Sequence, residues 1–181
     1  MNEHFDDLKF HRLLSSEDAL FGHFSELFQS SFPVNERRPL ESLKKIISDE
    51  SDVYCDAVLR NNVYVGLLVY WDFADFVYVE YLAVDPDIRG GGIGARILSQ
   101  LRDGVRKPVV LEVEPPFNEL AKRRIGFYER NGFVLLDNEY FQPSYGLVPG
   151  LELKLMSSGN LALEISEVID VIHRRVYDVK K

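Results

Sequence analysis

A glycine-rich turn in the middle of the chain combines residue types that bind phosphate groups. Four of the five positions from Gly90 to Gly94 are glycine, Arg89 precedes them, and apolar residues at helical spacing begin at Ile93. Glycines let backbone N–H groups approach a ligand without an intervening Cβ, and a helix start adds unpaired donors and the positive end of its dipole. Arg89 contributes a charged, planar guanidinium group. The pattern predicts phosphate binding; the alternative is a tight turn without a ligand.

Two other phosphate-binding motifs are excluded. A Walker A loop needs a lysine followed by serine or threonine after its glycines, and no lysine follows here. A dinucleotide fingerprint is matched by Gly90, Gly92 and Ala95, but its context is wrong. Five residues separate Val84 from Gly90, and the strand before the turn ends a meander instead of opening a strand–helix–strand unit.

The elements that position the turn follow from apolar spacing and turn signals. Ser16 is expected to cap a first helix, Pro39 to open a second, and Asn61-Asn62 to form a hairpin turn. A meander followed by parallel-type crossovers indicates an α/β fold with a mixed sheet and helices on its faces. The expected strands cover residues 8–14, 52–60, 63–71, 76–84, 109–114, 133–136 and 151–156, and later helices cover 93–105, 117–130 and about 160–177.

Composition indicates one ordinary domain over residues 1–181. The formal charge of -8 argues against nucleic acid and anionic membrane as partners. The longest apolar run has nine residues, too few to span a bilayer, and the first residues lack a signal peptide. Cys55 is the only cysteine, so we expect a small buried side chain and a reducing, cytoplasmic location. The four histidines show no ligand spacing, and no metal is expected.

At the glycine turn the chain resembles the GNAT superfamily of acyl-CoA-dependent N-acetyltransferases. Arg89, Gly92 and Gly94 fill its signature of Arg or Gln, two residues, Gly, one residue, then Gly or Ala. Residues 80–86 resemble the strand before the turn, and residues 127–133 resemble a later helix-to-strand junction. The resemblance implies a GNAT-like fold over residues 8–156, in which a central parallel strand pair splays apart. The C-terminal helix lies outside it.

The resemblance also implies a binding site for acetyl-CoA as co-substrate, in the opening between the strands that end near Val84 and Glu114. Backbone groups of the first strand would pair with the pantetheine arm, and amides of the glycine turn would bind the pyrophosphate. Asn118, followed by Ala121, matches an element that contacts the cofactor, with helix capping as its alternative. The expected cofactor-binding residues are Leu82, Ala83, Val84, Arg89, Gly90, Gly91, Gly92, Ile93, Gly94, Ala95 and Asn118.

Acetyl transfer to an amine requires a group that removes a proton. An amine of pKa near 10 is mostly protonated at pH 7, and a carboxylate can accept the proton. Glu80 is the first candidate, because it stands among apolar strand residues; an outward-facing polar position is the alternative. Glu112 and Glu114 share one strand face and would replace Glu80 or bind a cationic substrate. Tyr128 corresponds to the family tyrosine that protonates the leaving thiolate; core packing is its alternative.

The acceptor is expected to be a small cationic molecule with a primary amine, such as a polyamine, aminoglycoside or amino sugar. Tyr140 and Tyr145 belong to a segment that could wall its pocket, although a solvent-facing hairpin end fits equally. Arg37 and Arg38 are expected to be solvated, with carboxylate recognition as the alternative. A peptide or protein amine, or a noncatalytic acyl-CoA-binding module, remains the alternative function. The C-terminal helix either seals the core or pairs two copies as a homodimer.

Overall fold

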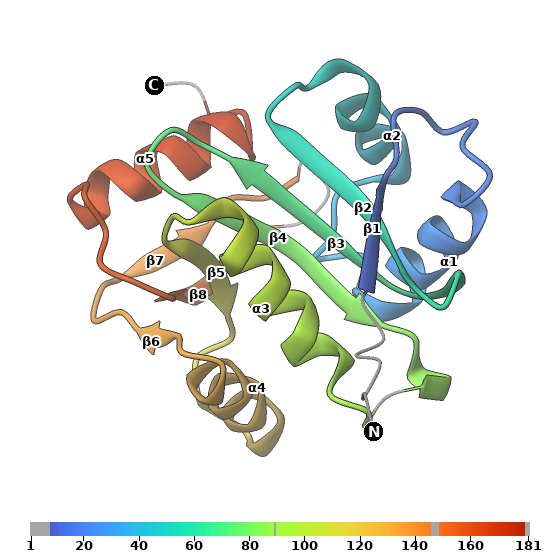
Figure 1. Cartoon of the computed structure of the whole chain (residues 1–181). Helices are drawn as coiled ribbons and strands as arrows, with labels where there is room; N and C mark the ends of the chain where they lie inside the picture. The colour runs from blue at the N-terminus through green and yellow to red at the C-terminus, as the bar shows by residue number, and fades with distance from the viewer. Residues whose placement is uncertain (1–7, 89, 146–148, 180–181) are drawn as a thin grey trace. The chain divides into compact units, whose positions relative to one another are not determined.

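The computed structural model describes residues 8–88, 90–145 and 149–179. These residues form eight strands and five α-helices (Figure 1). The strands are β1 (Leu8–Arg12), β2 (Val53–Arg60), β3 (Val63–Asp72), β4 (Val77–Val84), β5 (Val109–Val113), β6 (Val134–Leu135), β7 (Tyr140–Gln142) and β8 (Leu151–Ser157). The helices are α1 (Phe21–Ser31), α2 (Leu40–Asp49), α3 (Ile93–Val105), α4 (Glu119–Arg130) and α5 (Ile165–Arg175).

The sheet is mixed, as the sequence predicts. Its strand order is β1-β2-β3-β4-β5-β8-β6, and β7 pairs with β8. The pairs β1–β2, β5–β8, β6–β8 and β7–β8 are antiparallel, whereas β4 and β5 are parallel. This parallel pair within a mostly antiparallel sheet confirms the expected GNAT-like fold class.

The chain divides into two compact units, and the expectation of a single domain stays a prediction. The first unit comprises Met1–Tyr70 and Tyr81–Gln100. Its helix α1 buries Phe24 and Phe28, and α2, which packs against β2, buries Leu43. Cys55 is 1% exposed, which confirms its expected burial.

Two local features of the first unit test the sequence predictions. Asn61 and Asn62 have φ angles of 52° and 61°, which confirms the predicted hairpin turn between β2 and β3. The predicted cap at Ser16 is wrong, because α1 begins only at Phe21. The carboxylate of Asp18 instead accepts a hydrogen bond of 2.9 Å from the Leu20 amide. Such a short-range bond stabilises a turn in competition with the helix.

The second unit comprises Trp71–Glu80 and Leu101–Lys181. Its core includes β5 and β8 and the apolar face of α5, where Val168 and Ile172 are buried. Strand β7 is not predicted by the sequence, because it has only three residues and a partner on β8 that no local pattern identifies. No helix among the described residues is both long enough and apolar enough to cross a bilayer.

Candidate functional site

The parallel pairing of β4 with β5 places two glutamates at neighbouring positions of the second unit. The paired positions end with Val79 and Leu111, and Glu80 and Glu112 are the next residue on each strand. Polar and aromatic side chains surround these carboxylates. Together with the two glutamates they are here called the acidic-aromatic cluster. Its members are Trp71, Tyr78, Glu80, Glu112, Tyr140, Gln142, Tyr145 and Tyr177.

Glu80, which the sequence predicts to be the catalytic base, is half-buried. One carboxylate oxygen accepts a hydrogen bond of 2.7 Å from the indole Nε1 of Trp71, and the other accepts one of 2.7 Å from the Tyr145 hydroxyl. Trp71 is 1% exposed, so this donor is fixed by the core. The structure therefore brings Glu80 together with Tyr145, one of the two tyrosines expected to line the acceptor pocket.

Glu112 is held by more donors than Glu80. Oε1 accepts from the Tyr140 hydroxyl, Oε2 accepts from Gln142 Nε2 at 2.6 Å, and the Tyr177 hydroxyl lies 3.1 and 3.0 Å from the two oxygens. Burial raises the pKa of Glu112 above its ordinary value, although the hydrogen bonds from Tyr140, Tyr78, Gln142 and Tyr177 act in the opposite direction.

Glu114 does not join the acidic-aromatic cluster. Its carboxylate lies 2.8 Å from the guanidinium of Arg124 on α4. The two side chains are 37% and 51% exposed, so this is a solvated ion pair that contributes little to stability. A role for Glu114 in acceptor binding stays a prediction.

The glycine turn belongs to the first unit and leads into α3. Gly90 and Gly92 have positive φ angles of 99° and 70°. A Cβ at either position would meet nothing within 4 Å, so the backbone conformation, and not the available space, demands glycine. Helix α3 begins at Ile93, whose side chain is 3% exposed and anchors the helix start. Arg89 lies outside the residues that the structure describes.

The remaining predicted cofactor residues fall on both units. Ala83 is buried on β4, and Leu82 and Val84 are half-buried. Asn118 is the N-cap of α4, because its Oδ1 accepts a hydrogen bond of 2.9 Å from the Ala121 amide. The capping alternative is thus observed, and contact of Asn118 with acetyl-CoA stays a prediction.

Tyr128 lies on α4 and is half-buried between two phenylalanine rings. Its ring forms edge-to-face contacts with Phe127 and Phe133, at centroid distances of 5.2 and 5.7 Å. Burial raises the pKa of Tyr128 above its ordinary value. The phenol therefore stays protonated at neutral pH, as a proton donor must.

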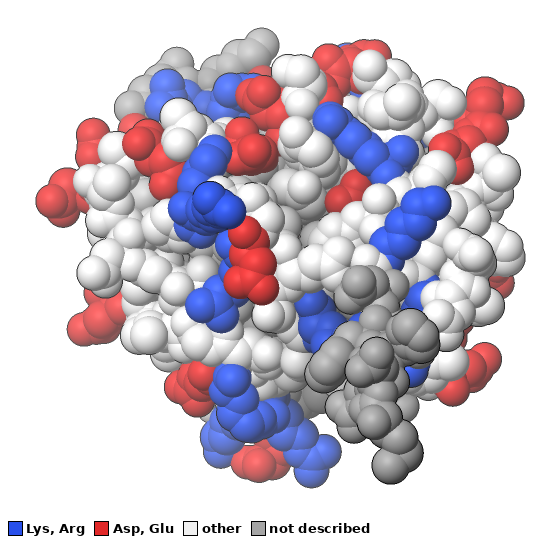
Figure 2. Space-filling view, viewed as in Figure 1, with Lys and Arg blue, Asp and Glu red and all other residues white. Residues whose placement is uncertain are grey.

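Helix α4 carries a local excess of positive charge despite the acidic composition. Figure 2 shows basic side chains gathered over this helix, at the bottom of the view. Lys122, Arg123, Arg124 and Arg130 are all exposed there, and Lys122 pairs with Glu119 at 2.9 Å. For metals, the described ranges contain no group of three or more His, Cys, Asp or Glu that could hold an ion.

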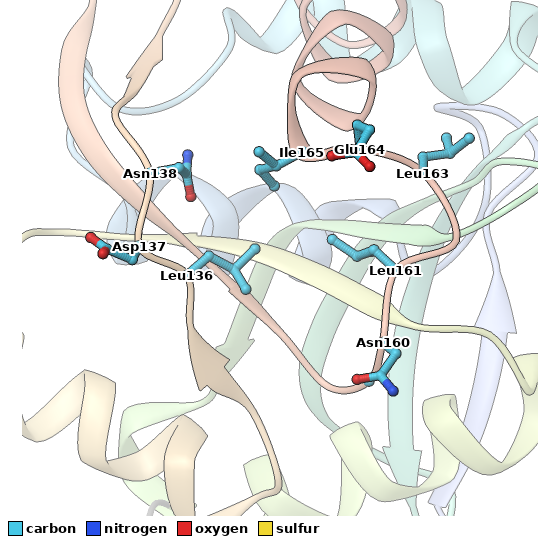
Figure 3. A pocket seen from close by; sticks show the side chains of 9 residues that line it. Leu136, Asp137, Asn138, Asn160, Leu161, Leu163, Glu164 and Ile165 are labelled. Carbon is cyan, nitrogen blue, oxygen red and sulfur yellow. The ribbon is translucent and has the colours of Figure 1, made fainter.

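A pocket of about 360 Å³ lies apart from the predicted site residues. The segment after β6 and the segment before α5 form it, and Leu136, Leu161 and Ile165 point toward one another inside it (Figure 3). The Oδ1 atom of Asn138, which also lines the pocket, is buried without a hydrogen-bond partner in the described part of the chain. None of the predicted catalytic, cofactor or acceptor residues lines this pocket.

Sequence reasoning missed three members of the acidic-aromatic cluster and misjudged one arginine. Trp71, Tyr78 and Tyr177 were not predicted. Each combines a large apolar ring with a hydrogen-bonding N–H or O–H group, and this combination was the signal available in the sequence. Arg38 is 3% exposed, so its expected solvation is wrong. Its backbone N–H donates to the Tyr81 hydroxyl at 3.0 Å, and its guanidinium donates to Ser42 Oγ at 3.2 Å.

Comparison with known proteins shows that the chain is similar to acetyltransferases. Residues 19–133 match the model of the Acetyltransferase (GNAT) family. A solved structure from Bacteroides thetaiotaomicron, assigned to the GNAT family, is 36% identical, covers 95% of this chain and 99% of its own, and has a TM-score of 0.89. Bacillus subtilis (strain 168) YjbC, assigned as an acetyltransferase, is 29% identical over 110 residues, or 60% of this chain. The match spans about half of YjbC, 55% of its length.

A more distant likeness is to Arabidopsis thaliana Naa50, solved in complex with the bisubstrate analogue CoA-Ac-MVNAL. It is 18% identical, covers 84% of this chain and 99% of its own, and has a TM-score of 0.61. At this identity the likeness concerns the fold.

Proposed function

Because the chain belongs to the Acetyltransferase (GNAT) family, we propose that it transfers the acetyl group of acetyl-CoA to a primary amine of a small cationic molecule. The amine nitrogen attacks the thioester carbon directly in a ternary complex, the carbon–sulfur bond breaks, and CoA leaves as a thiol. No covalent enzyme intermediate is needed.

The observation that carries this proposal is the environment of Glu80. Roughly one amine in a thousand is unprotonated at pH 7, so a base must take a proton before or during attack. Glu80 is a half-buried carboxylate on the strand leading to the glycine turn, and Trp71 and Tyr145 fix its orientation. We assign the base role to Glu80.

Glu112 is less suited to be the base. Both oxygens of Glu112 already accept hydrogen bonds, and the donors are Tyr140, Gln142 and Tyr177. A proton from an incoming amine would have to compete with these three donors. Glu112 is instead proposed to supply negative charge and a fixed wall on the acceptor side.

Tyr128 is proposed to be the general acid that protonates the departing sulfur. Its phenol keeps its proton because burial raises its pKa. The thioester oxygen gains negative charge during attack, and a backbone N–H near Val84 is proposed to stabilise it.

The binding of acetyl-CoA is proposed to involve the strand end Leu82–Val84 and the turn from Gly90 to Ala95. The positive φ angles at Gly90 and Gly92 and the start of α3 at Ile93 support an anion site formed by backbone amides. Arg89 is proposed to add charge to the pyrophosphate contact. The CoA-containing analogue bound by Naa50 supports this class of donor.

The proposed acceptor class follows from charge and ring content. Glu80 and Glu112 each have a tyrosine as hydrogen-bond partner, and this combination of negative charge and aromatic rings favours a positively charged acceptor molecule over a negatively charged one. A peptide amine is the second candidate, because the analogue in the Naa50 complex carries the peptide MVNAL.

The function is tested by measuring thiol release from acetyl-CoA across a panel of polyamines, aminoglycosides, amino sugars and N-terminal peptides. Turnover with a small cationic amine and none with peptides is expected. Preference for peptides would reverse the acceptor assignment. Binding of acetyl-CoA in calorimetry without turnover on any acceptor would instead indicate a noncatalytic acyl-CoA-binding protein.

A further inference from the structure

The C-terminal helix α5 brings a tyrosine into the acidic-aromatic cluster. A capping box between Glu164 and Glu167 fixes its start. Val168 and Ile172 are each 0% exposed, so they anchor its inner face. Tyr177 follows directly after the helix and is 9% exposed. This segment lies beyond residues 19–133, which match the family model.

The Tyr177 hydroxyl is saturated with hydrogen bonds. It lies 3.1 and 3.0 Å from the two oxygens of Glu112, 3.0 Å from Gln142 Nε2 and 3.1 Å from the Tyr78 hydroxyl. A phenol has one proton to donate and two lone pairs. Because the Glu112 carboxylate accepts and the Gln142 amide donates, Tyr177 donates to Glu112 and accepts from Gln142. In its contact with Tyr78, either hydroxyl can be the donor.

The ring of Tyr177 contacts the other half of the cluster. Its centroid is 4.9 Å from that of Tyr145, with the planes inclined by 43°. The Tyr145 hydroxyl in turn donates to Glu80 at 2.7 Å. Tyr177 therefore contacts Glu112 through its hydroxyl and the partner of Glu80 through its ring.

We propose that Tyr177 is a positioning residue for the acceptor amine. Its hydroxyl fixes the carboxylate of Glu112, its ring supports Tyr145, and through these contacts it sets the orientation of Glu80. The proposal rests on the proposed acetyl transfer to an amine. It implies that the C-terminal helix contributes to acceptor binding and turnover and not to acetyl-CoA binding.

The first test compares Tyr177→Phe with Tyr64→Phe. Tyr177→Phe keeps the ring contact and removes the hydroxyl. Tyr64 is a matched control, because its hydroxyl is buried and has no hydrogen-bond partner among the described residues. Tyr177→Phe is expected to lower kcat/KM for the acceptor about tenfold, as for loss of one hydrogen bond to a charged group, with the Kd for acetyl-CoA within about twofold. Tyr64→Phe should change neither. Unchanged acceptor kinetics, or an equal loss of acetyl-CoA affinity, would overturn the proposal.

A double-mutant cycle tests whether Tyr177 acts through Glu112. If it does, Glu112→Gln combined with Tyr177→Phe should have about the same acceptor kcat/KM as Glu112→Gln alone. Losses that multiply in full would show that the two residues act independently, against the proposal.

A carboxyl titration separates failure of this proposal from failure of the proposed function. If no amine is acetylated, the function fails, and ¹³C-labelled glutamate NMR still reports on Glu112, with Glu112→Gln assigning its resonance. The groups around Glu112 are Tyr140 and Gln142 on β7, Tyr78 and Glu80 on β4, and Tyr177. Loss of the Tyr177 hydrogen bond should raise the pKa of Glu112 further, because that bond favours the ionised form. An unchanged midpoint would show that Tyr177 does not fix this carboxylate.

Discussion

The indole Nε1 of Trp71 donates a hydrogen bond of 2.7 Å to the carboxylate of Glu80. The donor stands on β3 and the acceptor on β4, nine positions later in the chain. Because Trp71 is 1% exposed, the surrounding core determines where the carboxylate points. A glutamate held in this way is pre-organised for proton transfer, since little reorganisation is needed when the amine arrives.

Glu80→Gln should reduce acetyl transfer without reducing cofactor affinity. The amide keeps the size of the side chain but does not accept a proton as a base. We expect a loss of about 100-fold or more in kcat, the range found for general base catalysis. Steady-state kinetics and acetyl-CoA calorimetry check this, with Glu152→Gln, an exposed glutamate on β8, as the control. Wild-type turnover in Glu80→Gln would exclude Glu80 as the base.

Tyr128→Phe should lower kcat while leaving acetyl-CoA binding intact. The edge-to-face ring contacts with Phe127 and Phe133 remain, so folding should be preserved. Loss of the phenolic proton is expected to cost about 100-fold in kcat if the thiolate must be protonated as it leaves. Tyr54→Phe, on β2 of the first unit, is the control. Equal kcat values for both variants would leave Tyr128 with a packing role.

Alanine substitutions in the glycine turn should lower the free energy of unfolding only where the backbone has a positive φ angle. Gly92→Ala places a Cβ at a φ of +70° and is expected to lower the free energy of unfolding by about 1 kcal/mol. Gly91→Ala is the matched control, because a Cβ there also meets nothing within 4 Å and no positive φ is required. Denaturant unfolding without ligand measures both. Equal stabilities of the two variants would contradict the turn geometry.

Asp56 should make stability depend on pH. Burial raises its pKa to about 6, against a partial opposing effect of Arg12 and His11. Between about pH 4 and pH 6, the folded protein holds a proton that the unfolded chain has lost. The free energy of unfolding therefore falls as pH rises through this window, by up to about 3 kcal/mol.

Asp56→Asn removes this proton linkage. The variant should gain stability relative to the wild type as pH rises from 4 to 7, measured by denaturant unfolding at each pH. Asp75→Asn, at an exposed position, should show a difference from the wild type that does not change with pH. Parallel curves for the wild type and Asp56→Asn would contradict the raised pKa.

Features encoded by neighbouring residues were predictable. The hairpin at Asn61-Asn62, the glycine turn before α3 and the fold class follow from local conformational preference and apolar periodicity. The start of α1 was not predictable in the same way. Ser16 and Asp18 are both good partners for backbone amides, and the choice between them depends on which turn the tertiary structure stabilises.

Apart from β7, the sequence alone thus predicted the order of the strands and α-helices. It also predicted the glycine turn and the candidates Glu80 and Glu112, and the family resemblance added Tyr128. Only the tertiary structure decided how the carboxylates are held. Glu112 and Tyr177 are 65 residues apart, and their hydrogen bond depends on the position that α5 gives to the residues that follow it. The tertiary structure also gives the two glutamates of β5 different partners: Glu112 accepts hydrogen bonds from buried donors, whereas Glu114 forms a surface ion pair with Arg124. Strand periodicity puts both glutamates on one face, but hydrogen-bond partners are set by contacts between distant segments, which no local pattern encodes.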